Sequence, residues 1–160
     1  MAVASPSRTT RTVRRQYENF PYPHRDPADE LKRLKVTALE ELGILNQYCY
    51  RGKQSFRKGF RALLAGDGTG DTSVYLGQQL KETDATIVYL DLSDASMKIA
   101  RERTRCRGFE DKITWMKGSL LDLPDMGLEP FDYINCSGVL HHLADPSAGL
   151  AALESVLKDD

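Results

Sequence analysis

The hydrophobic positions from residue 60 onward gather into short apolar runs, separated by longer amphipathic stretches. Short apolar runs bounded by turn residues predict buried strands, and β-branched residues favour a strand further. Four runs are expected to form strands, 60–65, 85–91, 112–118 and 131–138, of which 85–91 is rich in β-branched residues. The stretches between them must connect one strand to the next.

Two of these connecting stretches have the spacing of amphipathic helices. The first covers residues 71–80 and the second covers 94–106. Ser93 suits the N-cap of the second helix, and Gly108 suits its end. The pattern therefore alternates strand and helix along this part of the chain.

A third helix is predicted to begin at Asp145 and Pro146, which suit a cap and a first helical residue. Its apolar face is expected to carry Leu150, Leu153 and Leu157. The predicted strands show little internal alternation of polar and apolar residues, which is typical of strands buried on both faces. The fold class that follows is α/β, a doubly wound parallel sheet with helices on both sides.

The chain ahead of residue 60 has a different character. Residues 19–27, "NFPYPHRDP", are rich in proline and aromatic residues and predict an extended linker. Asp26 and Pro27 then suit the start of a helix, and we expect one amphipathic helix over 27–47. The apolar positions of this predicted helix are Leu31, Leu34, Ala38, Leu42 and Leu45.

These patterns divide the chain into three parts. Residues 1–25 are predicted to be a basic flexible arm with the proline and aromatic segment, 26–59 an N-terminal helical cap and linker, and 60–160 the α/β domain. Residues 1–17 contain four arginines and no acid, which fits a disordered arm or an organelle transit peptide. The basic stretch 51–61 fits a solvated loop or a rim that attracts an anionic substrate.

Composition narrows the class of protein. The chain has 160 residues, a length that indicates one domain. Its net charge of −1 shows that the chain as a whole is not a polycation of the kind that binds nucleic acid. It has no apolar run near the ~20 residues of a membrane helix, so no membrane partner and a cytoplasmic location are expected. Cys49, Cys106 and Cys136 lie far apart and are predicted to be buried or partly buried free thiols in a reducing compartment.

A cluster of glycines follows the first predicted strand. Gly66, Gly68 and Gly70 stand in "AGDGTG", and Asp91 ends the next strand about 20 residues later. Glycines let a backbone turn sharply and approach a ligand, and a carboxylate at that point can bind a ribose diol. The spacing is GxGxG, whereas a dinucleotide fingerprint would require glycine at Asp71, so the unit predicts a nucleotide-containing ligand other than a dinucleotide.

With these motifs in place, residues 62–158 resemble the front half of a class I S-adenosylmethionine-dependent methyltransferase. The segment "QYENFPYP" at residues 16–23 resembles the lead-in of a bacterial group within that family. The resemblance implies a Rossmann-like sheet and S-adenosylmethionine as the cofactor. It also implies a methyl acceptor, a small molecule or a protein, whose identity the sequence does not reveal.

The resemblance assigns roles to residues along the predicted sheet. The loop with Gly66, Asp67, Gly68 and Gly70 would line the methionine and sulfonium end of the cofactor. Asp91 would bind the ribose and Leu92 would lie against the adenine. The other residues implied to contact the cofactor come from "GSLLDLP" and "CSGVLHHL": Ser119, Leu120, Cys136, Ser137 and Gly138.

The chain departs from the family pattern at several positions. Leu64 stands where an acid is frequent, Asp67 stands where a small or apolar residue is frequent, and Ser119 stands where the adenine-binding acid is often an aspartate. Asp122 is predicted to cap a loop and not to bind adenine.

Family members continue through seven strands in the order 3-2-1-4-5-7-6, so we expect a truncated fold of the first four strands. An open strand edge invites self-association.

Methyl transfer from a sulfonium needs the acceptor held in line, about 3 Å from the methyl carbon. A base is required if the acceptor is protonated, and His141 is the candidate; the alternative is that His141 and His142 only fill the mouth of the sheet. Adjacent histidines without a carboxylate partner predict no metal site.

The aromatic segment near the N-terminus leaves two possibilities open. Tyr17, Tyr22 and His24 could close over the cofactor, or they could simply pack an arm against the domain. The alternative to an enzyme is a non-catalytic nucleotide-binding or protein-interaction module derived from this fold.

Overall fold

The computed structural model describes residues 8–159. Four parallel strands form one sheet: β1 (Arg61–Ala65), β2 (Thr86–Asp91), β3 (Ile113–Lys117) and β4 (Tyr133–Asn135). Their order is β3-β2-β1-β4, which is the order that the resemblance implies for the first four strands. β4 is shorter than expected, because the backbone after Asn135 enters a turn in which Gly138 has φ +73°.

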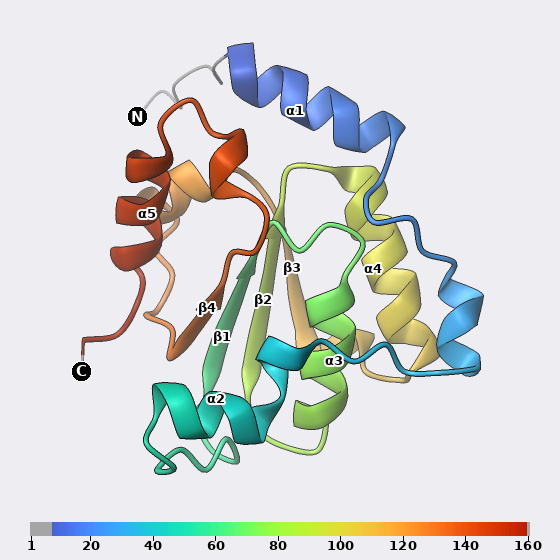
Figure 1. The fold of residues 1–160 in the computed structure, drawn as a ribbon, viewed down its shortest axis with the longest axis vertical. Helices are drawn as coiled ribbons and strands as arrows, with labels where there is room; N and C mark the ends of the chain where they lie inside the picture. Colours follow the sequence, from blue (N-terminus) through green and yellow to red (C-terminus); the bar gives the residue numbers. More distant parts are fainter. Residues whose placement is uncertain (1–7, 160) are drawn as a thin grey trace.

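Helices cover both faces of the sheet, as the doubly wound prediction requires (Figure 1). α3 (Asp71–Leu80) and α4 (Asp94–Cys106) pack on one face, and the short 3₁₀ helix η4 (Leu120–Asp125) and α5 (Pro146–Glu154) pack on the other. Both α3 and α4 have the predicted bounds, and the side chain of Ser93 caps α4 by accepting from the Ser96 N–H at 3.1 Å.

The central strand shows why both faces are needed. Ala62 and Leu64 of β1 point into the core under α3 and α4, whereas Leu63 and Ala65 point into the core under α5. All four side chains are almost fully buried. Burial of successive residues on opposite faces accounts for the continuous apolar runs in the sequence.

The apolar face of α5 is narrower than expected. Leu153 is buried, but Leu150 is 60% exposed, and Leu157 lies beyond the end of the helix. Leu157 instead forms an isolated parallel bridge with Phe131, just ahead of β4. The Phe131 N–H donates to the Val156 carbonyl and the Lys158 N–H donates to the Phe131 carbonyl, so the start of this sheet edge is paired.

The predicted helix over residues 27–47 is wrong. The segment forms two 3₁₀ turns, η1 (Pro27–Leu31) and η2 (Ala38–Glu40), followed by a separate helix α2 (Leu42–Cys49). The two turns place Glu30 and Glu40 in buried positions, while Leu31 and Leu39 are largely exposed. Polar contacts of these two acids, described below, override the helical spacing of the leucines.

Residues 8–25 are not the flexible arm that composition indicated. Arg8–Asn19 form helix α1, which lies across the carboxyl ends of the strands (Figure 1). The Glu18 carboxylate accepts hydrogen bonds from the N–H groups of Asp94 and Ala95 at 2.8 and 3.1 Å, and thereby joins α1 to the start of α4. The beginning of the predicted arm, together with the transit-peptide alternative that depends on it, lies outside the described residues.

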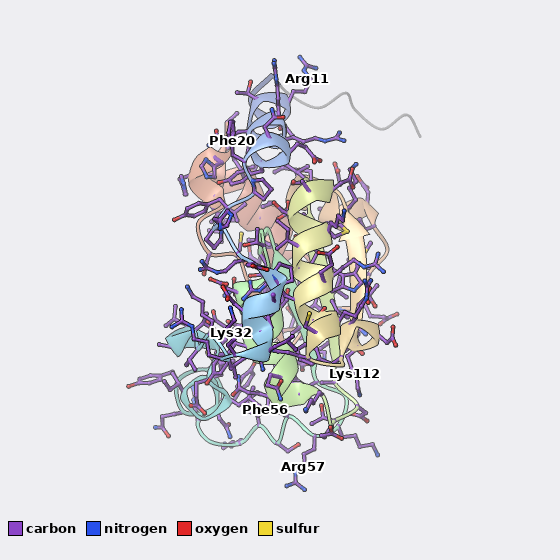
Figure 2. The ribbon with its side chains drawn as sticks, turned by 90° about the vertical axis from the view of Figure 1, so that its right-hand side faces the viewer. Arg11, Phe20, Lys32, Phe56, Arg57 and Lys112 are labelled. Carbon is purple, nitrogen blue, oxygen red and sulfur yellow. The ribbon has the colours of Figure 1, made fainter. Side chains whose placement is uncertain are left out.

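Figure 2 places Arg57 at the end of the molecule opposite Arg11 of α1. The basic stretch 51–61 therefore lies far from the carboxyl ends of the strands, and the solvated-loop interpretation fits it better than a rim. Among the cysteines, Cys49 and Cys106 are exposed, contrary to expectation, and Cys136 is half-buried. No helix in the described part of the chain has the length and apolar character needed to cross a membrane.

Candidate functional site

A cavity of about 610 Å³ lies between α1, the segment 22–40 and the carboxyl ends of the strands. A volume of this size is ordinary for a small-molecule site. Ten of the predicted site residues contribute to its lining: Gly66, Asp67, Gly68, Asp91, Leu92, Ser119, Leu120, Ser137, Gly138 and His141. Gly70 and Cys136 do not.

The glycine turn after β1 requires glycine for two different reasons. Gly66 and Gly68 have φ of +77° and +57°, and a Cβ at either position would lie 2.5 Å from a neighbour, Val139 Cγ2 and the Tyr22 carbonyl oxygen respectively. Gly70 has φ +90°, and its Cβ would lie 2.6 Å from the Cβ of Ala100 in α4. Gly70 therefore permits close helix packing, while Gly66 and Gly68 shape the cavity wall.

Asp91, the last residue of β2, lines the cavity beside the glycine turn. Its carboxylate accepts from the Gly68 N–H at 3.0 Å and from the Ser93 N–H at 2.9 Å. Burial raises the pKa of Asp91, and the charge of Glu18 adds to the rise, while the hydrogen bonds from Ser93 and Gly68 oppose it. A carboxylate that lines a cavity and is fixed by backbone N–H groups is suited to accept hydrogen bonds from a diol.

Asp67 has a structural role inside the glycine turn. Its carboxylate accepts from the N–H groups of Thr72 and Ser73 at 3.0 and 2.7 Å, and from the Ser73 hydroxyl at 2.5 Å. These N–H groups are free donors of the first turn of α3. Burial raises the pKa of Asp67 to about 6, against the opposing effect of these hydrogen bonds. The acid that looked unusual in the sequence thus caps a helix.

The turn after β3 forms the far wall. Ser119 and Leu120 line the cavity there, as the resemblance implies. The Ser119 hydroxyl accepts from the Leu121 N–H at 3.2 Å, and Asp122 accepts from the Ser119 N–H at 3.4 Å. This reciprocal pair is a capping box, so the prediction that Asp122 caps a loop is confirmed.

The segment after β4 divides into a buried and an accessible part. Ser137 and Gly138 line the cavity, whereas Cys136 packs into the core under α5. Burial raises the pKa of the Cys136 thiol to about 11, so this thiol stays protonated at neutral pH. Cys136 is therefore a packing residue of the core behind the cavity wall.

The two adjacent histidines of η5 (Leu140–His142) have different surroundings. The Tyr17 hydroxyl of α1 lies 2.9 Å from His142 Nε2 and the two rings meet edge to face. Burial lowers the pKa of His142, and the neighbouring His141 lowers it further, which favours the uncharged form of this ring. His141 is exposed, lines the cavity and makes no hydrogen bond through its imidazole to any described residue.

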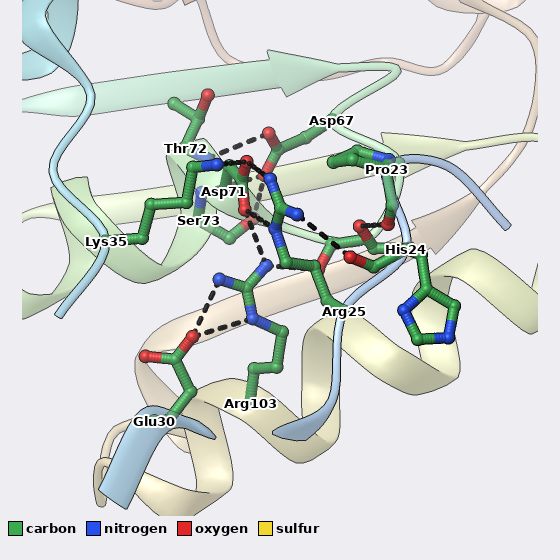
Figure 3. Close-up of polar contacts among 12 residues, drawn as sticks. Pro23, His24, Arg25, Glu30, Lys35, Asp67, Asp71, Thr72, Ser73 and Arg103 are labelled. Carbon is green, nitrogen blue, oxygen red and sulfur yellow. Dashed lines mark hydrogen bonds and ion pairs between the residues drawn. The ribbon is translucent and has the colours of Figure 1, made fainter. Parts of the chain in front are cut away.

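Charged residues that the sequence analysis did not single out fasten the N-terminal segment over the glycine turn (Figure 3). Arg25 binds Asp71 with two hydrogen bonds of 2.8 and 2.7 Å, and Arg103 of α4 binds Asp71 at 2.9 Å and Glu30 at 2.7 Å. Burial raises the pKa of Asp71, but the hydrogen bonds and charges of Arg25 and Arg103 outweigh it and lower the pKa to about 2.

Backbone groups of the aromatic segment and of the glycine turn belong to the same network of polar contacts. The Thr69 hydroxyl donates to the Pro23 carbonyl at 2.6 Å, and Arg103 donates to the Thr69 carbonyl at 2.8 Å. Tyr17 and Tyr22 line the cavity, whereas the ring of His24 points away from this network (Figure 3). The packing interpretation of the segment therefore holds, and because Tyr17 and Tyr22 line the cavity, closure over the cofactor stays a prediction.

The comparisons with known proteins agree with this geometry. The family model described as "Methyltransferase domain" matches residues 63–160. An uncharacterized protein of Synechococcus sp. is 44% identical over 97 residues, which cover 61% of this chain and 22% of that protein. A ubiquinone/menaquinone biosynthesis C-methyltransferase of Serratia proteamaculans is 30% identical over 104 residues, 64% of this chain and 40% of the relative.

Among solved structures, PKMT2 from Rickettsia typhi, in complex with AdoHcy, aligns with a TM-score of 0.54. It is 22% identical, and the match covers 62% of this chain and 19% of that one, so this likeness concerns the fold. The chain spans less than half the length of these relatives. Because the family model covers more than half of the chain, the chain belongs to the family of methyltransferase domains.

Proposed function

We propose that this chain binds S-adenosylmethionine in the cavity at the carboxyl ends of its strands and transfers the methyl group to an acceptor. The observation that carries the proposal is the placement of Asp91 beside the Gly68 turn, with Ser119 and Leu120 on the next wall of the same cavity. This arrangement places a ribose acceptor beside Ser119 and Leu120, the two residues that are proposed to meet the adenine. Membership of the methyltransferase family supports the ligand and the reaction.

The bound cofactor supplies an activated methyl group, so the residues of the chain mainly bind, orient and exclude water. α1 contributes Thr10, Val13 and Tyr17 to the roof of the cavity. The contact between Tyr17 and His142 holds this roof against η5. The roof limits the approach of water to the cavity.

We assign His141 as the base for an acceptor that carries a proton. Its imidazole lines the cavity and forms no hydrogen bond with any described residue, whereas the imidazole of His142 is hydrogen-bonded to Tyr17. The acceptor itself, a small molecule or a protein, is not specified by the cavity. Self-association through the β4 edge and a cytoplasmic location stay predictions.

Incubation with S-adenosylmethionine labelled in its methyl group, in an extract that lacks this protein, tests the function. We expect wild-type protein to transfer label to an extract component. The His141→Ala variant should bind the cofactor with unchanged affinity and transfer label about 100-fold more slowly, since a positioned base contributes at least that factor.

His24→Ala is the matched control, because His24 is exposed and does not line the cavity. It should transfer label at the wild-type rate. A wild-type protein that binds the cofactor and labels nothing would instead favour a non-catalytic binding module. An unchanged rate in His141→Ala would remove the assigned base.

A further inference from the structure

Four carboxylates line the cavity in the described part of the chain, and in three of them both oxygens accept hydrogen bonds from other groups of the protein. Asp67 caps α3, Asp71 pairs with Arg25 and Arg103, and Asp91 accepts two backbone N–H groups. The fourth is Glu40, at the end of η2. Its surroundings differ from those of the other three.

Glu40 is only 4% exposed, yet no cationic side chain among the described residues pairs with it. Its Oε1 accepts one hydrogen bond, from Asn135 Nδ2 at 2.6 Å, and its Oε2 accepts none from the described residues. A buried carboxylate without a cation is costly. Glu40 therefore occupies a position that a cationic ligand group would stabilise.

The backbone fixes Glu40 at this position from two sides. Gln79 of α3 donates to the Glu40 carbonyl at 2.8 Å and accepts from the Leu42 N–H at 3.0 Å. Asn135 ends β4 and is in register with Leu64, just before the glycine turn. Glu40 consequently lies on the β4 side of the carboxyl edge, opposite the β3 side that carries Ser119.

The positions of Ser119 on the β3 side and Glu40 on the β4 side determine which part of the proposed ligand meets Glu40. With the adenosine at Ser119 and Asp91, an extended S-adenosylmethionine places its amino-acid end beyond the glycine turn, towards β4. That end carries an α-ammonium group, a cation with three N–H donors. We infer that Glu40 binds the α-ammonium of S-adenosylmethionine, with Asn135 holding the carboxylate in place; this inference rests on the proposed function.

A chemical double-mutant cycle tests the assignment. The two ligands are AdoHcy and its analogue that lacks only the α-amino group, and the two proteins are wild type and Glu40→Gln. Neither ligand has a sulfonium, so any coupling belongs to the amino group. We expect wild type to bind AdoHcy about tenfold or more tightly than the analogue, which corresponds to one charge-assisted hydrogen bond.

The Glu40→Gln variant should bind the two ligands with nearly equal affinity, because the amide lacks the charge. Glu82→Gln, which changes an exposed glutamate outside the cavity, should behave as wild type. Equal affinities in the wild-type protein, or an unchanged preference in Glu40→Gln, would overturn the inference. The wild-type arm holds even if Glu40→Gln fails to fold. Binding of neither ligand to wild type would overturn the proposed function itself.

Discussion

Gly68→Val is expected to abolish S-adenosylmethionine binding while leaving the helical content nearly intact. Gly68 has φ +57°, which a β-branched residue rarely adopts, and a Cβ there would lie 2.5 Å from the Tyr22 carbonyl oxygen. The valine must therefore displace either the turn or the segment that covers it, and both line the cavity. We expect affinity to fall by at least about 100-fold, because the wall itself moves.

Gly127→Val separates this effect from backbone strain. Gly127 has φ +62°, a Cβ added there would meet no other atom within 4 Å, and the residue does not line the cavity. It should bear a similar backbone cost of about 1–2 kcal/mol and still bind the cofactor. Circular dichroism and a binding titration on both variants measure this. Normal binding by Gly68→Val would show that the loop is a structural turn and nothing more.

Asp91→Ala is expected to weaken S-adenosylmethionine binding by about 1–3 kcal/mol, the scale of losing charge-assisted hydrogen bonds to a buried partner. The carboxylate also accepts from the Gly68 N–H and thereby fixes the glycine turn. Part of the lost affinity is therefore expected to come from a more mobile turn in the variant. A titration of the folded variant measures the effect, with Asp111→Ala as the control, because Asp111 is exposed and lies outside the cavity. Unchanged affinity in folded Asp91→Ala would remove the ribose role.

The sequence predicted the sheet well because local signals agree there. In residues 60–106 the apolar runs, the glycine turn and the Ser93 cap all indicate the same elements, and the structure contains them with nearly the expected bounds. The strand order and the two covered faces also agree. Agreement between local preference and tertiary packing is what makes such segments predictable.

The N-terminal part could not be predicted from periodicity. Leucines at helical spacing indicated one helix over 27–47, but Leu31 and Ala38 are exposed. Leu45 is buried as predicted, whereas the other two buried positions belong to Glu30 and Glu40. Glu30 is held by Arg103 and Arg107, and Glu40 by Asn135, partners 73 to 95 residues away in the chain. Contacts at such separation leave no mark on local spacing.

The candidate site was predicted in outline and missed in detail. Gly66, Gly68, Asp91 and Ser119 line one cavity, as the motifs indicated. Gly70 allows α3 and α4 to pack closely, and Asp67 caps α3. These two roles could not be separated from ligand binding in the sequence, because the same loop forms the motif and begins α3. The ion pair between Arg25 and Asp71 holds the N-terminal segment on the glycine turn. The sequence shows an arginine next to the aromatic segment, but its partner is apparent only in three dimensions.

Isothermal titration of the wild-type chain with S-adenosylmethionine, and separately with NAD, tests the central claim most directly. The GxGxG turn and the cavity predict that one S-adenosylmethionine binds per chain and that NAD gives no binding heat at the same concentrations. Binding of NAD with equal or greater affinity, or the absence of any S-adenosylmethionine binding, would contradict the account.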